Sequence, residues 1–275
     1  LGSKAAAVPD SPQRRLVDHA SRTRIEALFF RTQYGREVPV PSMRGVLPWL
    51  ALLDAGVLAR VRRVAPEVMF EGGDPSRLPL EMRRELLSKA CARLSSARER
   101  RSLTDFQAVQ RFAAPDLASH IKALMATYRT DDEVLYFLMR MVWQGGILGA
   151  LDEAIVVASS STDFNVRTIA LRAVAVLGKD ADRATVRAAL LGGATAPERD
   201  WIAEAIETLP HDAAGVDWLL RACVGAKRRS RYNIDHLADA VETYSTKLPQ
   251  SLLPHLIEGL EALLSIGPIS DDDGQ

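Results

Sequence analysis

The sequence has little of what a disulfide-stapled or strongly charged protein contains. Its 275 residues include only two cysteines, Cys91 and Cys223, which stand far apart within separate helical patterns. This spacing argues against a disulfide framework and favours a reducing, cytoplasmic compartment. Lysine plus arginine equals aspartate plus glutamate, with 35 of each, so the net charge is zero. That balance argues against a domain dedicated to nucleic acid, although it leaves room for a local basic patch.

Membrane-spanning and catalytic signatures are also missing. No apolar run approaches the roughly 18 residues that a spanning helix needs, and there is no signal-peptide pattern, so no membrane partner is expected. The sequence contains neither GxxxxGK[ST] nor HExxH, and none of its five histidines has a second His or Cys at metal-ligand spacing. We therefore predict no catalytic residue, no metal and no cofactor, and we expect this chain not to be an enzyme.

What the sequence does contain is a helical pattern that repeats. Alanine, leucine and arginine dominate, and β-branched runs are scarce, which predicts an all-α fold. The clearest unit is residues 163–178, DFNVRTIALRAVAVLG, where small and apolar residues form one helix face before a glycine stop. The apolar positions Ala170/Ala173/Leu177 align with Ile202/Ala205/Leu209 and with Leu237/Ala240/Tyr244. Offsets of about 32 and 35 residues are typical of a stacked helical solenoid.

Four segments follow from these patterns. Residues 1–11 are expected to be a disordered tag or linker, and 12–145 an N-terminal region of irregular helical pairs. Residues 146–268 form the repeat region, and 269–275 an acidic frayed tail. Within the second segment we expect a helix from residue 12 to 30 and a loop over 33–41. The opening Leu1-Gly2-Ser3 lacks a methionine, which predicts a cloning scar or cleavage remnant ahead of a fragment.

Residues 163–178 resemble the second helix of a HEAT repeat. In that family an aspartate and a Val-Arg pair precede an Ala/Leu face and a terminal Leu-Gly. The matching residues here are Asp163, Val166, Arg167, Ala170, Ala173, Leu177 and Gly178. Later copies keep the apolar spacing but lose the Val-Arg pair. The resemblance implies a HEAT-like solenoid over roughly the C-terminal half.

Residues 46–84 are similar to the segment that follows the nucleotidase module in large bacterial NACHT or STAND-type NTPases. The match is carried by Trp49-Leu50-Ala51, Pro66-Glu67-Val68, Gly73-Asp74-Pro75-Ser76, Leu78-Pro79 and Arg83-Arg84. The resemblance implies a non-enzymatic sensor or scaffold arm of such an NTPase. Its partner would be another protein or the NTPase module upstream in the same chain.

Two basic clusters are the candidate partner contacts. One consists of Arg98, Arg100 and Arg101, and the other of Lys227, Arg228, Arg229 and Arg231. Because HEAT-like DNA glycosylases bind the duplex backbone on a basic concave surface, the second cluster could contact phosphates. A solvated loop between helices is the favoured interpretation. A nucleic-acid-binding protein or DNA glycosylase is the alternative function, and it would need aromatic residues for a flipped base. Trp143, Trp201 and Trp218 are available, but their helix-face spacing favours core packing.

Overall fold

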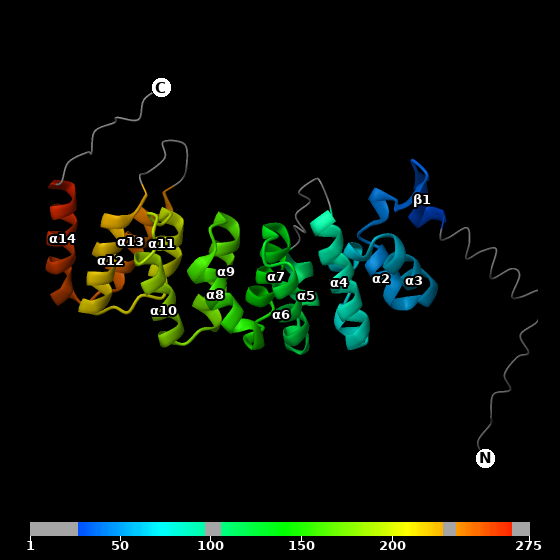
Figure 1. The fold of residues 1–275 in the computed structure, drawn as a ribbon, viewed down its shortest axis with the longest axis horizontal. Helices are drawn as coiled ribbons and strands as arrows, with labels where there is room; N and C mark the ends of the chain where they lie inside the picture. The colour runs from blue at the N-terminus through cyan, green and yellow to red at the C-terminus, as the bar shows by residue number, and fades with distance from the viewer. Residues whose placement is uncertain (1–26, 97–105, 228–234, 266–275) are drawn as a thin grey trace, which may run out of the picture. The chain divides into compact units, whose positions relative to one another are not determined.

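The computed structural model describes residues 27–96, 106–227 and 235–265, and within them the fold is all-α apart from one short hairpin (Figure 1). The chain divides into two compact units. The first unit comprises residues 1–97 and 103–112, and the second unit residues 98–102 and 113–275. The sequence grouped residues 113–145 with the N-terminal helices, whereas in the structure they pack with the helices that follow.

The hairpin is the part of the first unit that differs from the expectation. Strands β1 (Phe30–Gln33) and β2 (Arg36–Pro39) pair antiparallel, with Gln33 opposite Arg36. Tyr34 and Gly35 form the turn with φ of 50° and 72°, the left-handed values that a two-residue type I′ turn requires. The prediction of a loop over 33–41 was therefore wrong, and so was the end of the helix expected over 12–30, because Phe30 begins β1. Residues 27–29 are helical, and residues 12–26 lie outside the described residues. Arg31, Thr32 and Gln33 are exposed polar residues, so no apolar alternation announced a strand.

Helices form the rest of the first unit. They are α2 (Leu47–Leu53), α3 (Ala55–Val64), α4 (Leu80–Ser96) and α5 (Phe106–Phe112), with 3₁₀ turns η1 (Pro41–Met43), η2 (Pro66–Phe70) and η3 (Pro75–Arg77). Phe70 and Phe112 pack with ring centroids 4.0 Å apart. Asp74 caps η3 by accepting a hydrogen bond from the Ser76 backbone N–H. At Gly73, φ is +75° and a Cβ would lie 3.2 Å from Pro48, so this turn folds closely onto α2. Residues 48–76 thus form one packed element.

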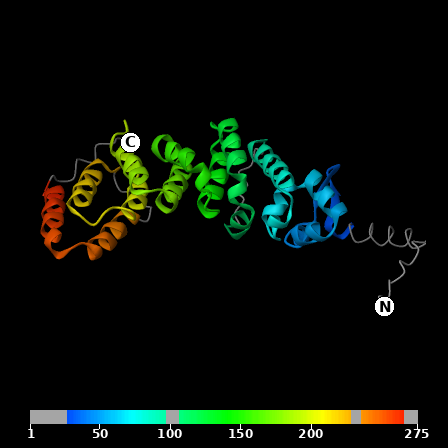
Figure 2. The same cartoon turned by 90° about the horizontal axis from the view of Figure 1, so that it is seen from below.

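The second unit consists of paired helices in two layers. Its helices are α6 (Ala118–Thr127), α7 (Asp132–Gln144), α8 (Leu151–Ser160), α9 (Phe164–Leu177), α10 (Asp180–Leu191), α11 (Arg199–Ile206), α12 (Ala213–Gly225), α13 (His236–Lys247) and α14 (Leu253–Ser265), with 3₁₀ turns η4 (Pro115–Leu117), η5 (Leu148–Ala150) and η6 (Gln250–Leu252). We call α7, α9, α11 and α13 the first layer, because each contacts the next. Likewise α8, α10, α12 and α14 contact in turn and make the second layer. The succession can be followed by colour in Figure 2.

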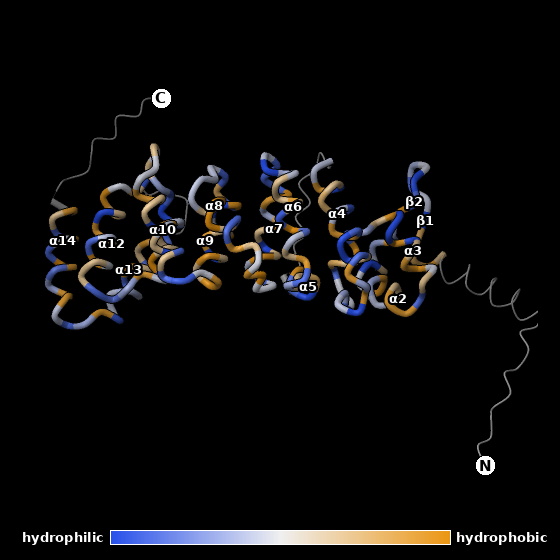
Figure 3. The backbone as a smooth tube through the Cα atoms, turned by 60° about the horizontal axis from the view of Figure 1, so that its bottom comes forward, coloured by the Kyte–Doolittle hydropathy of each residue, from blue (hydrophilic) through white to orange (hydrophobic). Residues whose placement is uncertain are grey.

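Aspartate caps and amphipathic faces explain why these helices form where they do. Asp131, Asp163 and Asp212 each accept a backbone N–H at the start of α7, α9 and α12. Figure 3 shows hydrophobic and hydrophilic stretches alternating along the helices. The aligned residues Ala170 and Ile202 are fully buried, and Leu237 is nearly so. The repeating apolar spacing therefore marks the faces that pack between the layers.

Three large side chains tie the α10–α11 and α12–α13 pairs to the pairs before them. The Trp201 Nε1–H donates to the Phe164 carbonyl at 3.2 Å, and the Trp218 Nε1–H to the Arg187 carbonyl at 3.2 Å. The Tyr244 hydroxyl donates to the Pro210 carbonyl at 2.7 Å. These partners are 37, 31 and 34 residues apart, close to the spacing of the apolar pattern. We call these three bonds the reach-back bonds.

Arg167, from the Val-Arg pair of residues 163–178, closes the end of the preceding helix. Its Nε donates to the Ala158 carbonyl at 2.8 Å and its Nη2 to the Ser159 carbonyl at 3.3 Å. Both carbonyls lie in the last turn of α8, where no further helical N–H is available to them. The guanidinium also lies 4.5 Å from the centre of the Trp201 ring. Arg167 therefore joins α8, α9 and α11 through one side chain.

Candidate functional site

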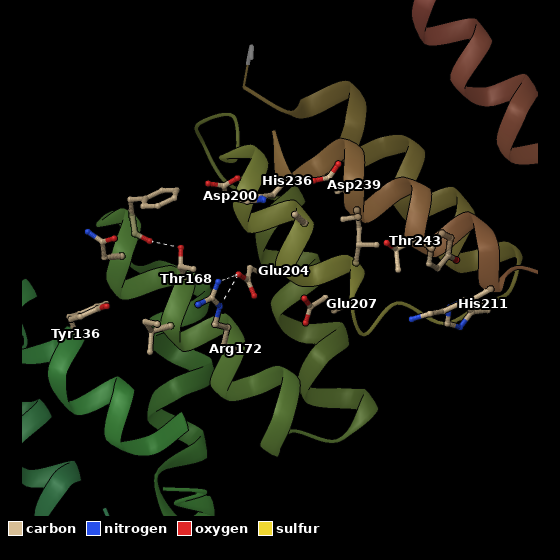
Figure 4. Close-up of a pocket in the computed structure, with 18 residues that line it drawn as sticks. Tyr136, Thr168, Arg172, Asp200, Glu204, Glu207, His211, His236, Asp239 and Thr243 are labelled. Atoms are coloured by element: carbon tan, nitrogen blue, oxygen red, sulfur yellow. Dashed lines mark hydrogen bonds and ion pairs between the residues drawn. The ribbon is translucent and has the colours of Figure 1, made fainter. Parts of the chain in front are cut away.

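A groove of about 750 Å³ runs along the first layer of the second unit (Figure 4). All four helices of that layer, α7, α9, α11 and α13, contribute to its walls, together with the segment after α11. Its lining residues are Tyr136, Phe164, Asn165, Thr168, Ile169, Arg172, Asp200, Ala203, Glu204, Ile206, Glu207, His211, His236, Asp239, Ala240, Thr243, Tyr244 and Lys247. The groove therefore belongs to the stacked layer as a whole and not to any one helix pair.

Helical spacing places these side chains on one face. In α11 and the turn that ends it, Asp200, Glu204 and Glu207 stand at i, i+4 and i+7, so their carboxylates share one side. In α13, His236, Asp239 and Thr243 stand at i, i+3 and i+7, which also places them on one side. No sequence motif marks this site, and the patterns described above do not predict it. The signal was nevertheless available as an acidic stripe on the face beside the apolar positions.

An ion pair crosses the groove between α9 and α11. The Arg172 Nε donates to Glu204 Oε1 at 2.8 Å, and a second guanidinium nitrogen bonds the same oxygen. The hydrogen bond from Arg172 to Glu204 raises the pKa of the guanidinium above its ordinary value. Glu204 exposes only 13% of its side chain. Arg172 also lies 5.5 Å from the centre of the Trp143 ring. Glu204 is thus the one groove carboxylate with a neutralising partner in the described part of the chain.

The other three groove carboxylates are not in ion-pair contact with a described cation. Asp200, Glu207 and Asp239 form no ion pair with any residue that the structure describes. Partial burial, followed by the neighbouring Glu204 carboxylate, raises the pKa of Glu207 above its usual value. In Figure 4 Asp200 and Asp239 lie toward the same end of the groove as His236, whereas Glu207 lies near Glu204. The described lining therefore carries four carboxylates against Arg172 and Lys247.

Aromatic side chains lie at two places along the groove. Phe164 is 41% exposed and stacks on Trp201 with ring centroids 6.2 Å apart. His211 stacks on Tyr244, whose ring is buried, at 5.1 Å. The groove therefore offers carboxylates, one paired guanidinium and partly exposed rings. These groups suit binding by charge and by apolar contact.

The basic clusters singled out in the sequence are not part of this groove as far as the structure describes them. Arg98, Arg100 and Arg101, and likewise Arg228, Arg229 and Arg231, lie outside the described residues. Lys227 is described, and its ammonium pairs with Glu198. Its backbone N–H also donates to the Pro197 carbonyl at 3.0 Å. Lys227 is thus engaged by the segment that precedes α11.

Trp201, Trp218 and Cys91 occupy the positions expected of core residues, whereas Trp143 does so only in part. Trp201 and Trp218 are buried, with 6% and 7% exposed, and both donate reach-back bonds. Trp143 is half-buried beside Arg172. Cys91 is buried, and burial raises the pKa of Cys223. Burial and the reach-back bonds therefore fix the positions of Trp201 and Trp218 in the core.

The described ranges hold neither a candidate metal site nor a candidate membrane-spanning helix. They contain no cluster of three or more His, Cys, Asp or Glu side chains arranged to hold a metal ion. None of the described helices is both long enough and apolar enough to cross a bilayer.

Comparisons with protein families, with curated proteins and with solved structures find no match for this chain. The HEAT-like and NACHT or STAND-type resemblances therefore stay predictions.

Proposed function

We propose that this chain is a non-enzymatic recognition arm and that its groove binds a segment of a protein partner. The observation that carries the proposal is the groove, because four successive helices of one layer build it from charged and aromatic side chains. Stacked helical arrays present extended surfaces of this kind to macromolecules. Pockets for small ligands are instead lined mostly by apolar residues, with a few polar groups. The charged lining thus favours a polymer partner over a small molecule.

The charge of the groove also favours protein over nucleic acid. Phosphate backbones are bound by lysine and arginine, and affinity for them depends on the cations that the protein supplies. The described lining instead has an excess of carboxylates. The nucleic-acid alternative rests on the two basic clusters and stays a prediction. A shift assay with duplex and single-stranded DNA tests it, since phosphate contacts would give binding that weakens steeply with salt.

The proposal extends to the parent protein. Residues 48–76 pack as one element, in which Gly73 approaches Pro48 and Asp74 caps η3. Residues 46–84 resemble the segment that follows the nucleotidase module of bacterial NACHT or STAND-type NTPases, and the close packing within this segment supports the view that it is a folded module and not a loose linker. A folded module at this place would connect the nucleotidase to the helical repeats. We infer that the chain is the sensor or scaffold arm of a larger cytoplasmic bacterial NTPase. The test is the reading frame upstream of Leu1: a P-loop there supports the inference, and a gene that begins near Leu1 overturns it.

Site-specific photo-crosslinking tests whether the groove binds a partner. A photoreactive amino acid is placed at Thr243, in the groove, and as a matched control at Val156, which is 63% exposed on α8 in the second layer. Both variants of the full chain are expressed in cells of the source organism and irradiated. We expect a protein adduct from position 243 and none from position 156. Equal adducts from both positions, or a nucleic-acid adduct from position 243, would contradict the proposal.

A further inference from the structure

We propose that the segment received by the groove is cationic, an extended stretch of polypeptide whose lysine or arginine side chains reach Asp200, Glu207 and Asp239. This inference rests on the proposed function and names the chemistry of the partner. The inference follows from the contrast between the net charge of the whole chain and that of the groove lining. The whole chain is neutral, with 35 residues of each sign. The described groove lining has four carboxylates and two cationic side chains, and so an excess of two negative charges.

The ion pairing of these carboxylates leaves them able to take a cation from a partner. Two acidic side chains elsewhere in the second unit show what such a pair between segments looks like. Asp235 accepts both nitrogens of Arg199, at 2.9 and 2.8 Å, and Glu153 lies 3.0 Å from the Lys122 ammonium. In the groove, Glu204 is bound by Arg172. Glu207, three residues further along, has no such partner among the described residues. A cation placed beside Glu207 would give it the kind of partner that Glu204, Asp235 and Glu153 have.

The spacing of the carboxylates favours a chain over an isolated ion. Asp200 lies in α11 and Glu207 is the residue that ends it, so the two are seven residues apart, which corresponds to two turns or about 10 Å along the helix. Asp239 lies on the next helix of the layer. Side chains at this separation cannot converge on one small cation, but residues two to four apart in an extended peptide span a similar length. A polypeptide carrying several cationic side chains therefore fits the distribution of charge.

The aromatic end of the groove gives such a peptide a second kind of contact. Phe164 is partly exposed and stacked on Trp201. Aromatic faces bind the guanidinium of arginine, and the apolar stems of lysine and arginine pack against rings. The same layout disfavours an acidic peptide, because it would meet three unpaired carboxylates.

Fluorescence anisotropy with defined peptides tests the inference on the full chain. The probes are labelled peptides of about 12 residues with the repeat Arg-Ala-Ala, Gln-Ala-Ala or Glu-Ala-Ala. We expect the arginine peptide to bind, its affinity to fall with rising salt, and the other two to bind at least tenfold more weakly. If the glutamine or glutamate peptide binds as well as the arginine peptide, or if none binds, the cationic inference is overturned.

Charge-removing variants locate the site. Asp200→Asn and Glu207→Gln should each weaken binding of the arginine peptide by roughly two- to fivefold, the effect of losing one partly exposed ion pair. The triple variant that adds Asp239→Asn should lose at least tenfold. Glu258→Gln, an exposed carboxylate on α14, is the matched control and should leave affinity unchanged. Circular dichroism checks that the variants remain folded. Folded variants that bind like the parent chain would overturn the site assignment.

The two proposals can fail separately. A protein adduct from position 243 together with no preference for the arginine peptide keeps the groove as a binding site and overturns only its cationic partner. In the opposite case, position 243 gives no more adduct than position 156, but the arginine peptide binds tightly and in a charge-dependent way. That result would overturn the protein partner proposed in cells and would keep the cationic preference of the groove.

Discussion

Replacement of Arg167 by alanine should destabilise the second unit strongly, because this side chain joins three helices. It donates to two carbonyls in the last turn of α8 and lies over the Trp201 ring of α11. Its environment is partly dry, since burial lowers the pKa of the guanidinium. The substitution therefore removes two hydrogen bonds from a charged donor and one ring contact at once.

The magnitude follows from these contacts. A hydrogen bond involving a charged group contributes about 1.5–3 kcal/mol, and a cation–π contact contributes roughly 0.5–2 kcal/mol. The sum is an upper bound, because the neighbouring Ser160 is exposed and water can bond part of the freed end of α8. We expect a loss of about 2–4 kcal/mol. In a unit of this length each kcal/mol lowers the melting temperature by about 2–4 °C, so Tm should fall by roughly 5–15 °C.

Thermal melting of the full chain by circular dichroism measures this effect. Arg167→Lys keeps the charge but has one ammonium in place of the guanidinium fork, so it should give an intermediate loss. The matched control is Arg221→Ala, an exposed arginine whose Nε bonds only a carbonyl of its own helix. The control should change stability by less than about 0.5 kcal/mol. If Arg167→Ala lowers Tm no more than the Arg221→Ala control does, the role assigned to the Arg167 side chain is refuted.

Three further substitutions test the packing of the second unit. Tyr244→Phe removes the reach-back bond to Pro210 and should cost about 0.5–1.5 kcal/mol. Burial raises the pKa of Tyr244 to about 12, so the contribution of this hydroxyl to the free energy of unfolding is complete below pH 10 and is lost as the pH rises toward 12. Melts of Tyr244→Phe should therefore lose less stability over this pH range than melts of the parent chain. Gly215→Ala should destabilise despite its better helix propensity, because a Cβ there would lie 2.0 Å from the Pro210 oxygen and 2.6 Å from the Tyr244 hydroxyl; an unchanged denaturation midpoint would contradict the packing. Glu207→Gln should raise Tm slightly at pH 7, since a carboxyl with a raised pKa opposes folding once it is ionised, and the difference from the parent should disappear below about pH 4.

The helices could be located from the sequence because their signals are local. Asp163 caps α9 and Asp131 caps α7, each standing directly before an apolar run. Asp54 caps α3 in the same way. Pro48 stands in the first turn of α2, where its missing N–H costs nothing. Caps, proline and apolar period act within one helix, so one sequence is enough to read them.

The hairpin and the groove could not be read in the same way. β1 and β2 are short and largely exposed, and Glu37 ties them to α3 through Arg60, a contact across 23 residues that no local pattern shows. The groove collects residues from position 136 to position 247. Its carboxylates have the spacing of an ordinary solvated helix face, and only the stacking of α9, α11 and α13 makes them line one surface. Non-local sites of this kind become visible once the layers are known.

The reach-back bonds have a consequence for how the second unit comes apart. Trp201 joins the α10–α11 pair to the α8–α9 pair, whereas Trp218 and Tyr244 both join the α12–α13 pair to the α10–α11 pair and the turn after it. Removal of the chain from α12 onward therefore breaks two of the bonds and leaves the Trp201 bond whole. Progressive truncation should therefore lower stability in steps, and a molecule pulled from its C-terminus should lengthen in increments of one helix pair. The spacing of 31 to 37 residues between the bonded partners would then set the size of each increment.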